Sequence, residues 1–215
     1  MYVVAHDLKA PLRGIANLSQ WIEDDLDGIS ATESQQHTRL LRRRVHRMET
    51  TIDGLLEYAR VGRPDGSREP VAIAQLLADE IDPPPTFTIA IDPNLPTLNT
   101  SRLLLFQVLT NLIGNAVKHH DRSDGSIHIF GRDLGDVYEL AIADDGPGIA
   151  PEYHDLIFAL FQAINPQNRS DSTGIGLSIV KKIIEAAGGT IRLESQIGKG
   201  TTFYFTWPQL KLIDN

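Results

Sequence analysis

Residues 102–119 read RLLLFQVLTNLIGNAVKH, and this stretch decides the fold expected for the second half of the chain. Its frequent apolar side chains predict one long buried helix. One face of that helix carries four polar residues at spacings of i, i+4, i+7 and i+8, namely Asn111, Asn115, Lys118 and His119. Amide oxygens suit a magnesium ion that bridges phosphates, and lysine adds a positive charge. The face is therefore a candidate phosphate site, although the wet side of an ordinary amphipathic helix would look the same.

The segments on either side of this helix alternate between strand and helix patterns. We expect further helices over 71–80 and 174–187, and strands over 87–91, 126–131, 137–143, 190–195 and 201–207. One layer of helices against a mixed sheet predicts an α+β fold, an α/β sandwich.

Two glycine-rich turns in this half also suit a nucleotide. Asp144 ends a predicted strand, and Gly146 and Gly148 follow it, so its carboxylate could accept a hydrogen bond from an adenine amino group. Asp-Gly and Pro-Gly are also common in plain turns. Residues 173–178, TGIGLS, open a predicted helix whose backbone N–H groups suit an anion. The Walker pattern is absent, which disfavours a P-loop enzyme.

The polar stretch 162–173, which follows Phe161, contains two apolar residues, Ala163 and Ile164. We interpret it as a mobile lid, although a surface loop without function would have the same composition.

The first sixty residues predict two helices in an antiparallel hairpin. An apolar stripe extends from Val4 to Leu26, and a heptad seam extends from Leu41 to Ala59. A hairpin of this size has too small a core to be stable alone, so we expect two copies to pair as a four-helix bundle. Residues 62–70 contain no aliphatic side chain and are the expected linker.

His6 lies roughly 160° around the first helix from Leu8, on the side opposite the apolar stripe. The chain has seven histidines, and a solvated surface position is the ordinary interpretation of any one of them. Pro11, however, bends the helix at the cost of a hydrogen bond. A neutral imidazole is a nitrogen nucleophile near pH 7, and the adjacent Asp7 could hold one ring N–H. His6 and Asp7 are therefore candidate catalytic residues.

Composition excludes several classes of protein. The chain has 215 residues and no cysteine, which excludes disulfides, thiolate catalysis and cysteine-ligated metals. Its net charge of −8 argues against a dedicated nucleic-acid binder, so residues 42–44, RRR, are interpreted as a solvated helix face rather than a nucleic-acid patch. No apolar run approaches the roughly 18 residues of a membrane span, and no signal peptide is evident. We expect a cytoplasmic protein, or the cytosolic part of a larger and membrane-bound receptor.

Five segments in this order resemble the sequence boxes of sensor histidine kinases. HDLKAPL from His6 resembles the phosphoacceptor box, and NLIGNAVKHH from Asn111 the asparagine box. DDGPGI and TGIGLSIV are similar to the two glycine boxes, and IFALF to the phenylalanine box. The resemblance covers almost the whole chain, and HDLKAPLRGI is most similar to the phytochrome-like and PAS-linked group.

The resemblance implies a dimerisation and phosphoacceptor hairpin (1–61), a linker (62–70), an ATP-binding domain of the type shared with gyrase and Hsp90 (71–208) and a tail (209–215). His6 would take the γ-phosphoryl group of ATP, with Asp7 as its acid–base partner, and would pass it to an aspartate of a response regulator. Asn115 and Asn111 would hold Mg²⁺. The implied ATP-binding residues are Asn111, Asn115, Lys118, His119, Asp144, Gly146, Gly148, Ile149, Phe161, Thr173, Gly174, Ile175, Gly176 and Leu177.

Two alternative functions and two departures from the family pattern accompany this resemblance. A nucleotide-binding scaffold without kinase activity is the alternative function, but the acceptor histidine and the asparagines are present. An ATPase motor of the gyrase type is disfavoured because Asn111 stands where those relatives place a glutamate. Ala10 predicts weak phosphatase activity towards the regulator. Only five residues precede His6, so we expect an isolated or a truncated kinase core whose shortened first helix weakens the dimer. We also expect the upstream sensor domain to be missing from this chain, and no direct contact with membrane or nucleic acid.

Overall fold

The computed structural model describes residues 14–15, 17–22, 31–61, 67–82, 84–162 and 174–209. The chain divides into two compact units. The first combines Met1–Ala59 with Leu160–Ile175, and the second combines Arg60–Ala159 with Gly176–Asn215. His6, Asp7, Ala10 and Thr173 lie outside the described residues, as does most of the expected lid.

The first unit contains a helical hairpin. Residues 17–22 are helical, and the 30-residue helix α2 spans Ala31–Arg60. The rings of Trp21 and His37 lie 5.7 Å apart, and a Cβ at Gly14 would collide with the guanidinium of Arg44. Residue 21 thus lies near residue 37 and residue 14 near residue 44, so the numbering rises along one segment as it falls along the other. This confirms the expected antiparallel arrangement.

Much of the apolar seam of α2 is only partly covered within one chain. Leu41, Val45 and Met48 are half-buried, whereas Ile52 is 40% exposed and Leu56, beside the seam, is 52% exposed. The helix therefore retains apolar surface for a partner.

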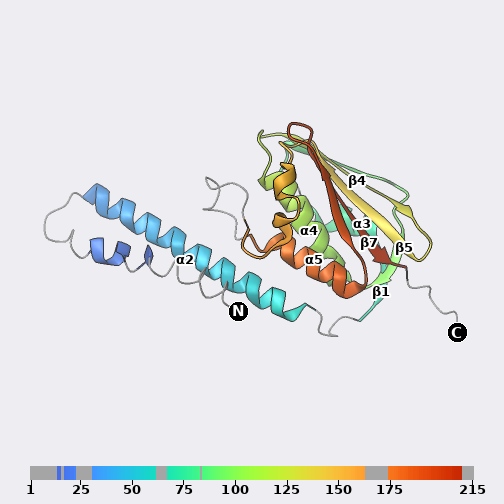
Figure 1. Ribbon diagram of the computed structural model, residues 1–215, viewed down its shortest axis with the longest axis horizontal. Coiled ribbons are helices and arrows are strands. Elements are labelled where there is room, and N and C mark those ends of the chain that lie inside the picture. Colours follow the sequence, from blue (N-terminus) through green and yellow to red (C-terminus); the bar gives the residue numbers. More distant parts are fainter. Residues whose placement is uncertain are drawn as a thin grey trace. The chain divides into compact units, whose positions relative to one another are not determined.

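The second unit is a layer of helices on a five-stranded sheet of order β2-β4-β5-β7-β6 (Figure 1). Strands β2 and β4 are parallel, and the other neighbours are antiparallel. A separate two-stranded sheet pairs β1 with β3. The strands are β1 (Glu69–Ala72), β2 (Phe87–Ile91), β3 (Thr97–Thr100), β4 (Gly125–Asp133), β5 (Val137–Asp144), β6 (Ile191–Ser195) and β7 (Thr201–Pro208).

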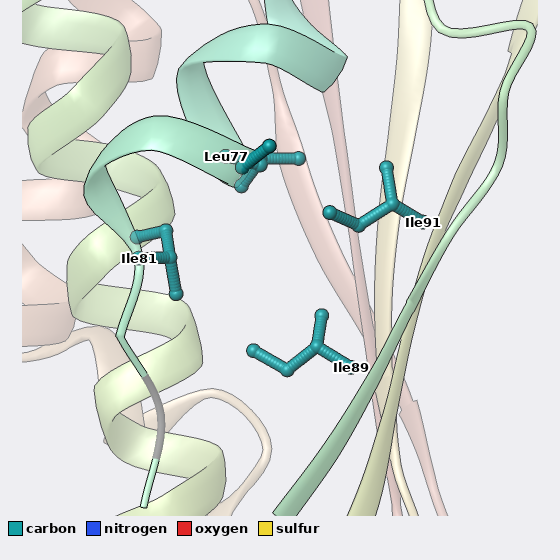
Figure 2. Close-up of a pocket in the computed structure, with 5 residues that line it drawn as sticks. Leu77, Ile81, Ile89 and Ile91 are labelled. Carbon is teal, nitrogen blue, oxygen red and sulfur yellow. The ribbon is translucent and has the colours of Figure 1, made fainter.

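The helices of this unit are α3 (Ile73–Glu80), α4 (Arg102–Lys118) and α5 (Gly176–Ala187), with 3₁₀ turns η1 (Pro151–Tyr153) and η2 (Leu156–Phe158). Helices α4 and α5 lie side by side (Figure 1). Beside them, α3 faces the edge strand β2, where Leu77 and Ile81 point towards Ile89 and Ile91 across a small apolar pocket (Figure 2).

The core lies between the helices and one face of the sheet. Along β7 every second residue is buried, so Phe203, Phe205 and Trp207 face the helices. Helix α5 packs against β7, whereas α4, whose Leu105 and Leu109 are fully buried, packs against β4 and β5. The Nε1 atom of Trp207 donates to Oγ1 of Thr100 at 2.9 Å, which ties the main sheet to the small one.

This architecture confirms the expected α+β fold, with two corrections. Residues 71 and 72 belong to β1 rather than to the helix expected over 71–80, and helix α5 begins at Gly176 rather than at 174. Strands β1 and β3 were not predicted, because each has four residues and pairs with a partner far along the chain. Among the described residues, no helix is long and apolar enough to cross a membrane.

Candidate functional site

Three neighbouring strands place one row of polar side chains at the end of the sheet. Asp144, the last residue of β5, pairs with Thr201 at the start of β7, and Thr201 pairs with Ser195 at the end of β6. Directly paired residues of antiparallel strands point to the same face of a sheet. On its other side Asp144 pairs with the fully buried Ile127 of β4, so the row faces the helical layer.

The carboxylate of Asp144 is partly satisfied by the backbone. Its Oδ1 atom accepts hydrogen bonds from the N–H groups of Gly146 at 3.0 Å and Thr201 at 3.3 Å. Burial raises the pKa of Asp144, and these two backbone donors only partly oppose that effect. Both hydrogen bonds that the described residues donate to this carboxylate go to Oδ1, so Oδ2 can accept from a ligand.

Two glycines allow the turns around Asp144 to approach one another closely. Gly148 has φ +72°, and a Cβ there would collide with the carbonyl oxygen of Gln196. Gly200 has φ +87°, and a Cβ there would collide with the carbonyl oxygen of Asp144. The turn after β5 and the β6–β7 turn therefore meet backbone to backbone.

The amide side chains of α4 form a second cluster. Nδ2 of Asn111 donates to the Gln107 carbonyl at 2.9 Å, so Oδ1 is the side-chain atom with which Asn111 can bind a ligand. That oxygen faces the start of α5, where a Cβ at Gly176 would lie 2.8 Å away. One turn further on, Nδ2 of Asn115 is buried and has no hydrogen-bond partner among the described residues.

The amides fit a magnesium–phosphate group. A buried amide left unpaired costs about 1–3 kcal/mol, so the Nδ2 donor of Asn115 fits a ligand acceptor such as a phosphate oxygen. Amide oxygens are hard ligands of the type that Mg²⁺ accepts. The first backbone N–H groups of the 12-residue helix α5, beside Asn111, suit phosphate oxygens.

The end of α4 carries a charge and two histidines with different surroundings. Lys118 is exposed in the last turn. Partial burial, together with the charge of Lys118, lowers the pKa of His119, which favours its neutral form. The side chain of His120 is only 1% exposed, and its ring meets that of Phe87 edge-on at 5.3 Å.

His120 helps to anchor Asp145, the residue after Asp144. Nε2 of His120 lies 3.1 Å from Oδ1 of Asp145, the N–H of Ser126 donates to the same oxygen at 2.7 Å, and Arg122 donates to Oδ2 at 2.6 Å. The Ser126 hydrogen bond, followed by those of His120 and Arg122, lowers the pKa of Asp145 to about 2. The end of α4 is thus held directly against the turn that carries Asp144.

Phe161 and Gly174 belong to the first unit and form a junction of their own. Phe161 adopts φ +65°, and its N–H donates to the carbonyl of Gly174 at 2.9 Å. Gly174 has φ +67°, and a Cβ there would lie 2.7 Å from the Gln162 carbonyl oxygen. Non-glycine residues with positive φ are uncommon and often occur at functional sites.

The structure groups the predicted site residues unevenly. Asp144, Gly146, Gly148 and Ile149 share one turn, which the N–H of Ile149 ties to Oγ of Ser195 at 2.8 Å. Asn111 and Gly176 are neighbours, and Leu177 is half-buried in the first turn of α5. Phe161, Gly174 and the buried Ile175 fall in the first unit.

Sequence reasoning missed Ser195, Thr201 and the anchor at His120. The available signal was a third glycine-rich turn, QIGKGTT at 196–202, directly after a predicted strand. Its role depends on strand pairing, which brings it beside a residue more than fifty positions earlier in the chain.

Comparison with known protein families gives two matches. Residues 100–211 match the family described as histidine kinase-, DNA gyrase B- and HSP90-like ATPase. Residues 1–64 match the His Kinase A (phospho-acceptor) domain.

Similar proteins agree with these matches. Cyanobacterial phytochrome B of Nostoc sp. is 34% identical over 95% of this chain, and the sensor protein RstB of Escherichia coli is also 34% identical over 95%. The chain spans only 28% of the length of the first protein and 47% of the second. The crystal structure of full-length ShkA in complex with AMPPNP superposes with a TM-score of 0.63 and 26% identity, over 96% of this chain and 45% of that one.

Proposed function

Because the chain belongs to the histidine kinase-, DNA gyrase B- and HSP90-like ATPase family and forms the catalytic core of a sensor histidine kinase, we propose that it phosphorylates its own His6 from ATP. The phosphoryl group would then pass to an aspartate of a response regulator. The observation that carries the proposal is that one domain holds both a half-buried acceptor, the carboxylate of Asp144, and an unsatisfied buried amide, Nδ2 of Asn115.

Asp144 would hold the base of ATP. Its Oδ2 accepts a hydrogen of the adenine amino group, while Oδ1 stays bound to the backbone of Gly146 and Thr201. At Gly148 no side chain projects from the backbone, which lies close to that of Gln196. The flat adenine ring can stack against this surface, with Ile149 beside it.

The amide cluster would hold the phosphates. Asn115 and Asn111 would supply oxygens to Mg²⁺, and Lys118 and the first turn of α5 at Gly176 and Leu177 would contact phosphate oxygens. When bound, Mg²⁺ neutralises charge that develops on the transferring phosphoryl group. Asn111 is an amide and cannot deprotonate water, so the site would retain ATP until an imidazole arrives.

His6 would be the nucleophile. One ring nitrogen attacks the γ-phosphorus, the bond to the bridging β–γ oxygen breaks and ADP leaves, while Asp7 holds the N–H of the other ring nitrogen. The left-handed backbone of Phe161 and Gly174 supports a lid hinge at these two residues, and Thr173 would contact ATP.

Pairing of two chains would bring these parts together. We assign the dimer to residues 1–61, the linker to 62–70, the ATP-binding domain to 71–208 and the tail to 209–215. The partly exposed seam residue Ile52 and its neighbour Leu56 support an interface with a second copy.

The test is incubation with Mg²⁺ and γ-labelled ATP, followed by mapping of the labelled residue. We expect acid-labile, alkali-stable phosphate on His6, lost in His6→Gln and Asn115→Ala. His46→Gln is the matched control, because that imidazole is 83% exposed on α2. Saturable ATP binding without any label would instead favour a nucleotide-binding scaffold.

A further inference from the structure

The hydroxyl of Ser195 makes three contacts at the centre of the row of polar side chains. Its Oγ accepts from the N–H of Ile149 at 2.8 Å, donates to the carbonyl of Gly200 at 2.9 Å and lies 2.9 Å from Oγ1 of Thr201. It therefore joins the turn after Asp144 to the β6–β7 turn.

A count of protons fixes the direction of the contact with Thr201. A serine hydroxyl has one hydrogen to donate and two lone pairs to accept with. The carbonyl of Gly200 can only accept, so the hydrogen of Ser195 is used there, and Ile149 occupies one lone pair. All three contacts are hydrogen bonds only if Thr201 donates its own hydrogen to Ser195.

This assignment leaves Thr201 without a hydrogen for a ligand. Thr201 is 5% exposed, and its hydroxyl retains only acceptor capacity. Its neighbour in the row, the carboxylate of Asp144, is also an acceptor, since its Oδ1 takes N–H donors on the side of Gly146 and Thr201. Two acceptors side by side favour a ligand edge that donates.

We propose that Ser195 is a positioning residue for base selection: by taking the hydrogen of Thr201, it makes this end of the site accept a 6-aminopurine and reject a 6-oxopurine. The proposal rests on the proposed function, in which Asp144 holds the base of ATP. The 6-amino group has two hydrogens to donate, whereas the oxygen of a 6-oxopurine would face two acceptors. Ser195 itself does not touch the nucleotide.

The experiment compares the binding of ATP and inosine triphosphate, measured by displacement of a fluorescent nucleotide in the presence of Mg²⁺. In Ser195→Ala the hydroxyl of Thr201 becomes able to rotate and to donate. We expect the ratio of the two affinities to fall about tenfold, the usual scale of one hydrogen bond at a buried site. Ser195→Thr retains a hydroxyl and should restore the ratio.

Two further variants separate this role from a structural one. In Thr201→Val no hydroxyl is left to orient, so adding Ser195→Ala should leave the ratio unchanged. Ser195→Cys keeps the volume but replaces the oxygen by a weak acceptor, and it should reproduce the effect of alanine if the alanine variant does not fold.

A wild-type protein that binds ATP, together with a Ser195→Ala variant that weakens both nucleotides equally, would overturn the inference and leave the proposed function intact. A wild-type protein that does not bind ATP would overturn both.

Discussion

Replacing Gly148 by alanine tests the close backbone contact that forms the base end of the site. Gly148 and Gly198 have nearly equal φ values, +72° and +76°, so alanine suffers the same intrinsic strain at either position. The surroundings differ. A Cβ at Gly148 would collide with the carbonyl oxygen of Gln196 and lie 2.7 Å from its carbon, whereas a Cβ at Gly198 has nothing within 4 Å.

The two costs follow from these geometries. The left-handed conformation costs a non-glycine residue about 1–2 kcal/mol, and this is the whole expected effect of Gly198→Ala. Gly148→Ala incurs the same strain and also forces two backbone segments apart. Overpacking of this type adds about 1–3 kcal/mol, so we expect a total of about 2–5 kcal/mol. The displaced turn carries Ile149 and adjoins Asp144, so ATP affinity should fall at least tenfold.

Urea unfolding and ATP binding measure both effects. Trp207 is 2% exposed and Trp21 is 51% exposed, so the fluorescence change on unfolding reports mainly on the domain that contains Trp207. Gly198→Ala should retain nearly full ATP affinity. Equal losses of stability and of affinity in the two variants would refute the argument, because strain in φ alone would then explain both.

Three further results are expected. Asp145→Asn should lose stability relative to wild type at neutral pH, and urea midpoints should converge as the pH falls from about 4 to about 2, because a lowered pKa stabilises the fold only while the carboxylate is ionised. Asp144→Asn should unfold at a higher temperature than wild type at pH 7, because burial raises the pKa of Asp144 and its charged form opposes folding. The difference in unfolding temperature should vanish in acid, where the wild-type carboxyl is neutral. ATP affinity of this variant should fall about tenfold or more. Glu139→Gln should cost about 1 kcal/mol by chemical denaturation, because its 10% exposed carboxylate lies 2.7 Å from the exposed Arg132 and 3.4 Å from Arg192; an unchanged midpoint would show that these pairs contribute nothing.

Local patterns in the sequence predicted much of the fold. Helix α4 ends within one residue of its expected limit, because its apolar period is strong and long. Strand β2 occupies the expected residues, because a short apolar run between turn residues has few alternatives. Asp144 could be placed at a strand end for the same reason.

Features that depend on long-range pairing could not be predicted. The row of Asp144, Thr201 and Ser195 exists only because β7 lies between β5 and β6, an order that no local pattern encodes. His119 and His120 are adjacent and identical in type, and only the tertiary contact with Phe87 decides which ring is buried. His119 stays the residue predicted to face the ligand, and His120, for which no role was predicted, anchors the turn.

The anchor at Asp145 has a consequence for nucleotide size. The side chains of His120 and Arg122, which follow α4, tie the end of that helix to the turn after β5, and the N–H of Ser126 in β4 donates to the same carboxylate. The base end and the phosphate end of the proposed pocket are therefore held at a fixed separation. A nucleotide analogue with a longer spacer between base and phosphates would have to release one end in order to hold the other.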